Sequence, residues 1–315
     1  MRSRLDEAGA ARGRRLELAV RVPPTLADCR RIGLDAGLWM REGLADILIA
    51  GGGFIPFETP VASFVEAARG TGCRVLGCFE ALSPMLNEET MRAVAARCWA
   101  AGVDGLYFFN YYSMPNEWKR EFVAELADPA KLAGGSKRYK VDCSGRELPD
   151  SQLGFSFFNA IPRAQLPVRL QETVPGRGTS LAIDLSGEDP AAAASAVLGL
   201  SFETSGDGGP AGQRAVSLAV NGHRLHWEEG KAPGAAWTET RYDADWNEYP
   251  SRLAETPLEG EEQVEFAVPP SLLAPGINRV EIALEKGDPA WLCGVRLSIR
   301  YAEDREAAAA GAGSG

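Results

Sequence analysis

Apolar residues in the first 110 positions recur in short continuous runs that alternate with amphipathic stretches. Four of these runs have the character of buried strands, and their starts lie 30, 29 and 30 residues apart: 16–22, 46–51, 75–80 and 105–110. Between them, segments such as 61–69 and 87–101 carry apolar residues at helical spacing. The pattern predicts four strand–helix units and a parallel sheet.

A unit of this length, repeated eight times, builds a (β/α)8 or TIM barrel of roughly 250 residues. Here four units precede a different kind of sequence. Residues 1–145 are therefore predicted to form half of such a barrel. We expect the chain to be an N-terminally truncated fragment of a longer barrel protein.

Beyond residue 165 the chain changes to short alternating strands divided by Gly, Pro and Asn. This pattern predicts a jelly-roll-like β-sandwich over 166–303, after a linker at 146–165. The Asn-Gly pair within Val220–Leu225 predicts a hairpin with a tight turn. The tail 304–315 is low in complexity and is expected to be disordered. The predicted fold class is α/β plus all-β.

Composition and charge narrow the partners of this 315-residue chain. Hydrophobic residues make up 45% and charged residues 24%, and no apolar run approaches the roughly 20 residues that span a bilayer. The net charge of -10 and the pI of about 5.0 disfavour nucleic acid. The first 15 residues lack the apolar stretch of a signal peptide. We expect no membrane span, and a cytoplasmic location unless residues that direct secretion or periplasmic export precede Met1.

Metals and cofactors are not expected. The six cysteines form no CxxC pair and only two histidines occur. The run Gly51–Gly53 is interpreted as a turn, because no GxGxxG pattern surrounds it and Pro56 interrupts it. Asp243, Asp245 and Asn247 are spaced like the first ligands of a calcium loop. The residues that follow them exclude an EF-hand and leave an irregular calcium site open.

Chemistry-bearing residues follow the predicted strands of the first domain. Glu80 ends the run 75–80, and in barrel enzymes the reacting groups come from the carboxyl ends of strands. Arg21 lies near the end of the first run. A guanidinium at this place suits an ion pair with a carboxylate, either one of the protein or one on a substrate. Structural salt bridges are the alternative for both residues. Three further candidates for binding sugar hydroxyls and sugar faces lie at the end of the fourth run or directly after it: Asn110, Tyr111 and Tyr112.

Aromatic residues also gather in the polar segment WTETRYDADWNEY of the second domain. Trp237 and Trp246 are its candidates for a sugar-stacking platform. The alternative is that these aromatics fold against the sandwich without binding a ligand.

Five phrases within residues 14–140 form a pattern that a known family shares. In the most specific of them, GLDAGLWMREGLADILIAGGG, the residues that recur in the expected spacing are Asp35, Trp39, Glu42, Gly43 and Asp46. The other phrases are LELAVRVP, VLGCFEA, GVDGLYFFNYYSM and ELADPAKLAGGSKRYKV. With these phrases, residues 14–140 resemble the C-terminal half of the family-10-like glycosyl hydrolase barrels of environmental bacteria. The resemblance implies a barrel fold and hydrolysis of O-glycosyl bonds.

In the clan of retaining glycosidases that share this barrel, the nucleophile is a Glu at the end of strand seven. The acid/base is a Glu at the end of strand four. Counting back from the last barrel strand makes the four runs strands five to eight, which places Glu80 at the nucleophile position and the acid before Met1. A retaining mechanism needs both carboxyl groups, so we expect the chain to be inactive by itself.

Two functions therefore remain open. One is a glycoside hydrolase-like protein, and the other is a non-catalytic carbohydrate-binding or structural protein. Both predict a carbohydrate as the partner. If the half-barrel is the whole protein, its open sheet edges predict a homodimer.

Overall fold

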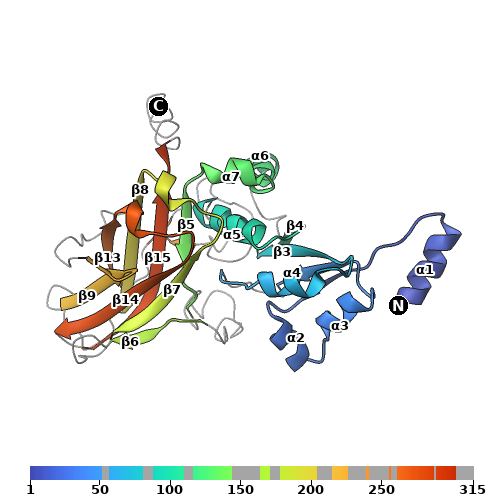
Figure 1. The fold of residues 1–315 in the computed structure, drawn as a ribbon, viewed down its shortest axis with the longest axis horizontal. Helices are drawn as coiled ribbons and strands as arrows, with labels where there is room; N and C mark the ends of the chain where they lie inside the picture. Colours follow the sequence, from blue (N-terminus) through green and yellow to red (C-terminus); the bar gives the residue numbers. More distant parts are fainter. Residues whose placement is uncertain are drawn as a thin grey trace. The chain divides into compact units, whose positions relative to one another are not determined.

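The computed structural model describes the chain as two units. Its described residues are 1–51, 57–80, 88–109, 116–143, 164–170, 178–203, 215–225, 239–240, 255–256, 261–286 and 289–302 (Figure 1). The first unit comprises Met1–Ser83 and Cys98–Met114, and the second comprises Pro84–Arg97 and Pro115–Gly315. The helix α5 (Glu88–Ala100) contributes residues to both.

The first unit contains a parallel sheet in the strand order β1-β2-β3-β4. Its strands are β1 (Ala19–Val22), β2 (Ile47–Ala50), β3 (Arg74–Glu80) and β4 (Gly105–Phe109). Its other helices are α1 (Arg2–Ala11), α2 (Leu26–Arg31), α3 (Ala36–Arg41) and α4 (Ala62–Ala68). The predicted strands and their parallel pairing are confirmed. Within the described residues β1 and β4 each have one neighbouring strand, so a closed barrel is not shown.

The two faces of this sheet differ in what they contact. One face is almost fully buried, with Val22, Leu48 and Val75 at most 1% exposed. On this face Gly77 lies against the sulfur of Cys98 in α5, so close that no β-carbon would fit between them. The opposite face is also apolar, and its residues pack around Ile49 and Cys78.

Local signals in the sequence account for the short helices. Thr25 caps α2, because its hydroxyl accepts a hydrogen bond from the amide of Asp28. Asp35 caps α3 in the same way through the amide of Leu38.

The second unit is rich in antiparallel strands, which form one sheet in the order β10-β9-β14-β7 and another in the order β13-β8-β15-β5. A third strand, β6, also pairs with β15, and β11 pairs with β12. The strands are β5 (Lys137–Lys140), β6 (Val168–Leu170), β7 (Thr179–Leu185), β8 (Ser195–Glu203), β9 (Ala215–Val220), β10 (His223–Leu225), β11 (Glu239–Thr240), β12 (Glu255–Thr256), β13 (Glu261–Val268), β14 (Gly276–Lys286) and β15 (Ala290–Arg300). Its further helical segments are α6 (Asn116–Leu126), α7 (Pro129–Ala133) and the 3-10 turns η3 (Pro190–Ala192) and η6 (Pro270–Leu272).

Alternate residues of β7 and β13 are buried, so each sheet has one face in the interior. The predicted hairpin is confirmed: β9 and β10 are joined by Asn221 and Gly222, both with positive φ. The pairing of β5 with β15 places Lys137–Lys140 in a sheet of the second unit.

Most of the expected linker, 146–163, lies outside the described residues, as does the tail from residue 303. The four ranges into which the sequence divides the chain therefore stay predictions. No described helix combines the length and the apolar character that crossing a bilayer requires.

Candidate functional site

The carboxyl end of the parallel sheet is the part of the first unit where the sequence predicted chemistry. Glu80 is the last residue of β3, and the register pairs it with Phe109, the last residue of β4. Because side chains alternate along a strand, the position of Glu80 belongs to the same face as Leu76 and Cys78. The backbone of Glu80 is therefore placed as predicted, while its side chain lies outside the description.

Arg21 on β1 contacts Phe109 on β4. The guanidinium carbon of Arg21 lies 3.5 Å from the centre of the Phe109 ring, a cation–π contact. Two strands separate β1 from β4, so a flat sheet would hold their backbones about 14 Å apart. A contact this short across the face is favoured by a sheet that curves toward it, as the wall of a barrel does.

The same guanidinium retains an unused donor. Nη1 of Arg21 is buried and has no hydrogen-bond partner in the described structure. A buried donor without an acceptor costs about 1–3 kcal/mol, more for a charged group. The stacked guanidinium is therefore held in place by an aromatic ring while part of its hydrogen-bonding capacity stays open.

Apolar and aromatic side chains surround Arg21 on this face. Ile49 and Cys78 are buried, and their partly buried neighbours are Ile47, Leu76, Tyr107 and Phe109. Tyr107 and Phe109 offer ring faces of the kind that stack on the C–H groups of a sugar. The arrangement can hold a ligand that is apolar on one side and carries an acceptor for Arg21.

The other predicted site residues cannot be placed. Asn110, Tyr111 and Tyr112 lie outside the described residues, as do Trp237 and Trp246. The segments with Gly52–Gly53 and with Asp243–Asn247 also lie outside them. Of the seven predicted site residues, the structure describes the side chain of Arg21 alone, and it brings that residue to the end of the sheet where Glu80 ends β3.

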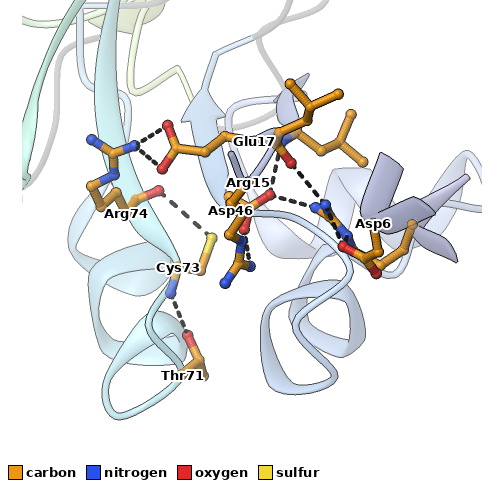
Figure 2. A network of polar contacts seen from close by, with 10 residues as sticks. Asp6, Arg15, Glu17, Asp46, Thr71, Cys73 and Arg74 are labelled. Carbon is orange, nitrogen blue, oxygen red and sulfur yellow. Dashed lines mark hydrogen bonds and ion pairs between the residues drawn. The ribbon is translucent and has the colours of Figure 1, made fainter. Parts of the chain in front are cut away.

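The amino-terminal edge of the sheet holds a network of charges with a structural role (Figure 2). Asp46 accepts hydrogen bonds from the Leu18 amide at 2.7 Å and from Arg2 at 2.6 Å, and it forms an ion pair with Arg15. Burial by itself raises the pKa of Asp46, but the Leu18 amide and the two arginines outweigh it and hold that pKa below its ordinary value. This edge is opposite to the one where Glu80 ends β3.

Metal binding finds no support in the described part of the chain, where no group of three His, Cys, Asp or Glu side chains could hold an ion. All six cysteines are described and buried, and no disulfide joins them. Burial raises the pKa of the Cys29 thiol to about 11, and a nearby Asp28 adds to this effect. Cys29 is therefore a protonated thiol at neutral pH, which disfavours a nucleophilic role.

A buried polar cluster in the second unit was not predicted from the sequence. Nζ of Lys137 lies 2.9 Å from a carboxylate oxygen of Glu188, and both side chains are at most 1% exposed. Tyr301 donates a hydrogen bond of 2.5 Å to the other oxygen of Glu188. Burial, and then the charge of Glu188, raises the pKa of Tyr139 well above its ordinary value. Lys137 carries no signal in the sequence, because a lysine in a short strand normally faces water.

Comparisons with known proteins were made for the whole chain. No family model and no curated protein matches it. Among solved structures, it is similar to a beta-porphyranase of glycoside hydrolase family 86 from the human gut bacterium Bacteroides plebeius, with 16% identity over 39% of this chain and 18% of that one, at a TM-score of 0.22. A second family 86 enzyme, solved in complex with neoagarooctaose, is 14% identical over 52% of this chain and 18% of that one, at a TM-score of 0.25.

A family 35 carbohydrate-binding module from an environmental isolate is 18% identical over 38% of this chain and 65% of that one, at a TM-score of 0.21. The matched part spans less than a fifth of the length of the two family 86 enzymes. At these TM-scores and identities the likenesses carry no argument about the fold or the activity of this chain.

Proposed function

We propose that this chain is a glycoside hydrolase-like protein whose carbohydrate site lies at the carboxyl end of β1–β4. The observation that carries the proposal is the contact of Arg21 with Phe109, which brings a cation and an aromatic ring to the end of the sheet where Glu80 ends β3. Under this proposal the sheet is the C-terminal half of a (β/α)8 barrel. The β-rich part is then an accessory β-sandwich of jelly-roll type.

Glu80 is the proposed nucleophile. In a retaining mechanism one carboxylate attacks the anomeric carbon while a second carboxyl group, about 5 Å away, protonates the leaving oxygen. The glycosyl ester that forms is then hydrolysed by water, with the second group acting as the base. The proposal assigns the first role to Glu80 and leaves the second unassigned.

The test is hydrolysis by the full chain and its Glu80→Gln variant, measured on a panel of neutral and acidic polysaccharides and on activated aryl glycosides of the same sugars. The leaving group of an activated aryl glycoside departs without a proton from the second carboxyl group. On these aryl glycosides we expect slow hydrolysis by the unaltered protein and at least a hundredfold loss in the variant, the order seen when one essential catalytic group is removed. Glu66→Gln is the matched control, because Glu66 is an exposed carboxylate on α4 that pairs with Arg69. Equal activity of Glu80→Gln and Glu66→Gln would remove Glu80 from the reaction.

Binding without hydrolysis is the second candidate function. The aromatic rings of Tyr107 and Phe109, which pack on the same face of the sheet, favour it as much as they favour an enzyme, since both uses need an aromatic surface for the sugar. Affinity electrophoresis on the same polysaccharides separates the two. Retarded migration without hydrolysis of the aryl glycosides would support a carbohydrate-binding protein and contradict the hydrolase.

If the half-barrel is the whole protein, we propose that two copies of the chain pair with each other. Within the described residues β1 and β4 each offer one edge without a neighbouring strand. A twofold axis along the barrel would pair β4 of one copy with β1 of the other, both in parallel orientation. Light scattering should give twice the 33.7 kDa mass of the chain, and a monomer at all concentrations would contradict this pairing.

A further inference from the structure

One face of the parallel sheet carries Arg21 near the carboxyl ends of its strands. Among the described side chains at that end of the face, Arg21 is the charged one. The other described side chains there are apolar or aromatic: Ile49, Leu76, Cys78, Tyr107 and Phe109. Removing a guanidinium from water among such residues is unfavourable unless it gains a partner. The Phe109 ring supplies part of that compensation, at 3.5 Å from the guanidinium carbon.

The ring cannot satisfy all the N–H groups of Arg21. A stacked aromatic face contacts the plane of the guanidinium and leaves the N–H groups at its edge directed past the ring. One of these groups, Nη1, is buried and has no hydrogen-bond partner within the part of the chain that the structure describes. The guanidinium is thus fixed in orientation while a donor at its edge stays open.

An oxyanion is the ligand that such a group recognises best. The planar fork of arginine matches the two oxygens of a carboxylate or a sulfate, and hydrogen bonds between ionised groups are about twice as strong as those between neutral ones. A neutral hydroxyl would satisfy the donor without using the charge. The net charge of -10 would repel acidic sugars from most of the surface, so their capture needs a local cation such as Arg21.

From these observations we infer that Arg21, held by Phe109, is a specificity-determining residue that binds an anionic substituent of the carbohydrate, either a uronate carboxylate or a sulfate ester. This inference rests on the proposed function and names the substrate class of that site. In this arrangement Tyr107 and Phe109 contact the apolar face of the sugar, and Arg21 binds the anionic group that the sugar carries. A neutral sugar of the same shape leaves the donor unsatisfied and binds less well.

Two matched pairs of oligosaccharides test the inference by calorimetric titration of the full chain. One pair is a uronic-acid oligosaccharide and its neutral methyl ester, and the other is a sulfated galactan oligosaccharide and its desulfated form. In at least one pair we expect the anionic member to bind roughly tenfold more tightly or better, as one charge-assisted hydrogen bond requires. The pair that shows the difference identifies the anion.

Variants of the protein assign that preference to Arg21. Arg21→Gln should abolish the preference while retaining binding of the neutral member, and Arg21→Lys should restore part of it because the charge remains and the fork is lost. Arg69→Gln is the control, since Arg69 is an exposed arginine directly after α4. Phe109→Leu removes the ring that holds the guanidinium and should therefore weaken the preference for the anionic sugar. This variant gives a second test of the inference if Arg21→Gln does not fold.

Three results of the binding measurements would overturn the inference. They are equal binding of both members in both pairs, an undiminished preference in Arg21→Gln, and no binding of any of the four oligosaccharides. Loss of hydrolysis in Arg21→Gln by an equal factor for neutral and anionic substrates would also contradict it, because Arg21 would then serve the reacting groups. Equal binding of neutral and anionic sugars together with hydrolysis that depends on Glu80 would leave the proposed function standing. An Arg21-dependent preference without hydrolysis would instead reject the enzyme and keep the anion site.

Discussion

Asp46 and Asp104 make the same pair of hydrogen bonds at equivalent points of the repeat. The carboxylate of Asp46 accepts from the Leu18 amide at 2.7 Å, and its own amide donates to the Leu18 carbonyl at 2.9 Å. Asp104 repeats both contacts with Val75, at 2.7 and 2.8 Å. Each aspartate immediately precedes one strand and binds the chain at the amino-terminal side of the neighbouring strand. The two residues therefore fix the register of β1 with β2 and of β3 with β4.

We expect the free energy of unfolding to fall as the pH drops below about 4. The pKa of Asp46 is lowered in the folded protein, because the Leu18 amide, Arg15 and Arg2 outweigh the opposing effect of burial. The pKa of Asp184 is lowered too, since its hydrogen bonds to Ser186 and its ion pair with Arg97 outweigh burial. Unfolded aspartates titrate near ~3.9. Stability from these groups is thus present above that pH and is lost as the pH falls through the lower folded values.

Urea unfolding at a series of pH values measures this dependence. Asp46→Asn should lower the stability at neutral pH and flatten the acid limb of the profile. Asp6→Asn is the matched control, because Asp6 also pairs with Arg2 but is 57% exposed and such surface pairs contribute little. An acid limb of unchanged steepness in Asp46→Asn would show that the titration of this residue is not coupled to folding.

Gly77 and Cys98 predict a size limit inside the first unit. A β-carbon at position 77 would lie 2.5 Å from the sulfur of Cys98, well inside van der Waals contact. We expect Gly77→Ala to destabilise the protein by about 1–3 kcal/mol, the usual cost of overpacking a core. Adding Cys98→Ala removes the sulfur and should recover part of the loss.

Thermal unfolding of the single and double variants measures the coupling between these two positions. Cys98→Ala alone serves as the control. Additive effects of the two substitutions would contradict a direct clash between the new methyl group and the sulfur.

Asn278 predicts that an amide is required at the start of β14. Its Oδ1 accepts from the Ala274 amide at 2.8 Å and from Asn221 at 2.7 Å, and its Nδ2 donates to the carbonyls of Ala274 and Gly276. The side chain is almost fully buried. Asn278→Asp keeps the shape but presents an acceptor to two carbonyls, so we expect a loss of about 2 kcal/mol or more.

Urea unfolding should show this loss at neutral pH. Ser180→Ala is the control, since the exposed Ser180 hydroxyl accepts only a long bond, 3.3 Å, from Arg279. A stability of Asn278→Asp equal to that of Ser180→Ala would mean that the loop before β14 does not depend on this amide.

The strands could be predicted from the sequence because the information is local. Continuous apolar runs with spacing near 30 residues identified β1 to β4, and alternation identified the antiparallel strands other than β5, β11 and β12. The Asn221-Gly222 turn was also predicted, since few residues other than Asn and Gly adopt positive φ at low cost. The helices α6 and α7 were not anticipated, and neither was the pairing of β5 with β15, because the partner strand lies about 160 residues away.

The candidate site was only partly predictable for a similar reason. The end of a strand can be recognised along the chain, and Glu80 and Arg21 were chosen as candidate site residues on that basis. The contact of Arg21 with Phe109 depends on the curvature of a four-stranded sheet, and curvature is not encoded in a single segment. Pairing between distant charges is equally invisible, since no rule of spacing connects Lys137 to Glu188.

The ion pair of Lys137 and Glu188 predicts strong coupling between β5 and the segment after β7. Lys137→Met would leave the Glu188 carboxylate buried without its counter-charge, with the Tyr301 hydroxyl still donating to it, and breaking a buried pair in this way costs about 3–5 kcal/mol. Glu188→Gln should also destabilise, because it leaves the ammonium group without its counter-charge. The double variant removes both charges, so we expect it to be more stable than Lys137→Met alone. Urea unfolding of all three variants and of Arg69→Gln as a surface control measures this coupling. If the double variant loses the sum of the two single losses, the buried charges act independently and the pair does not connect the two segments.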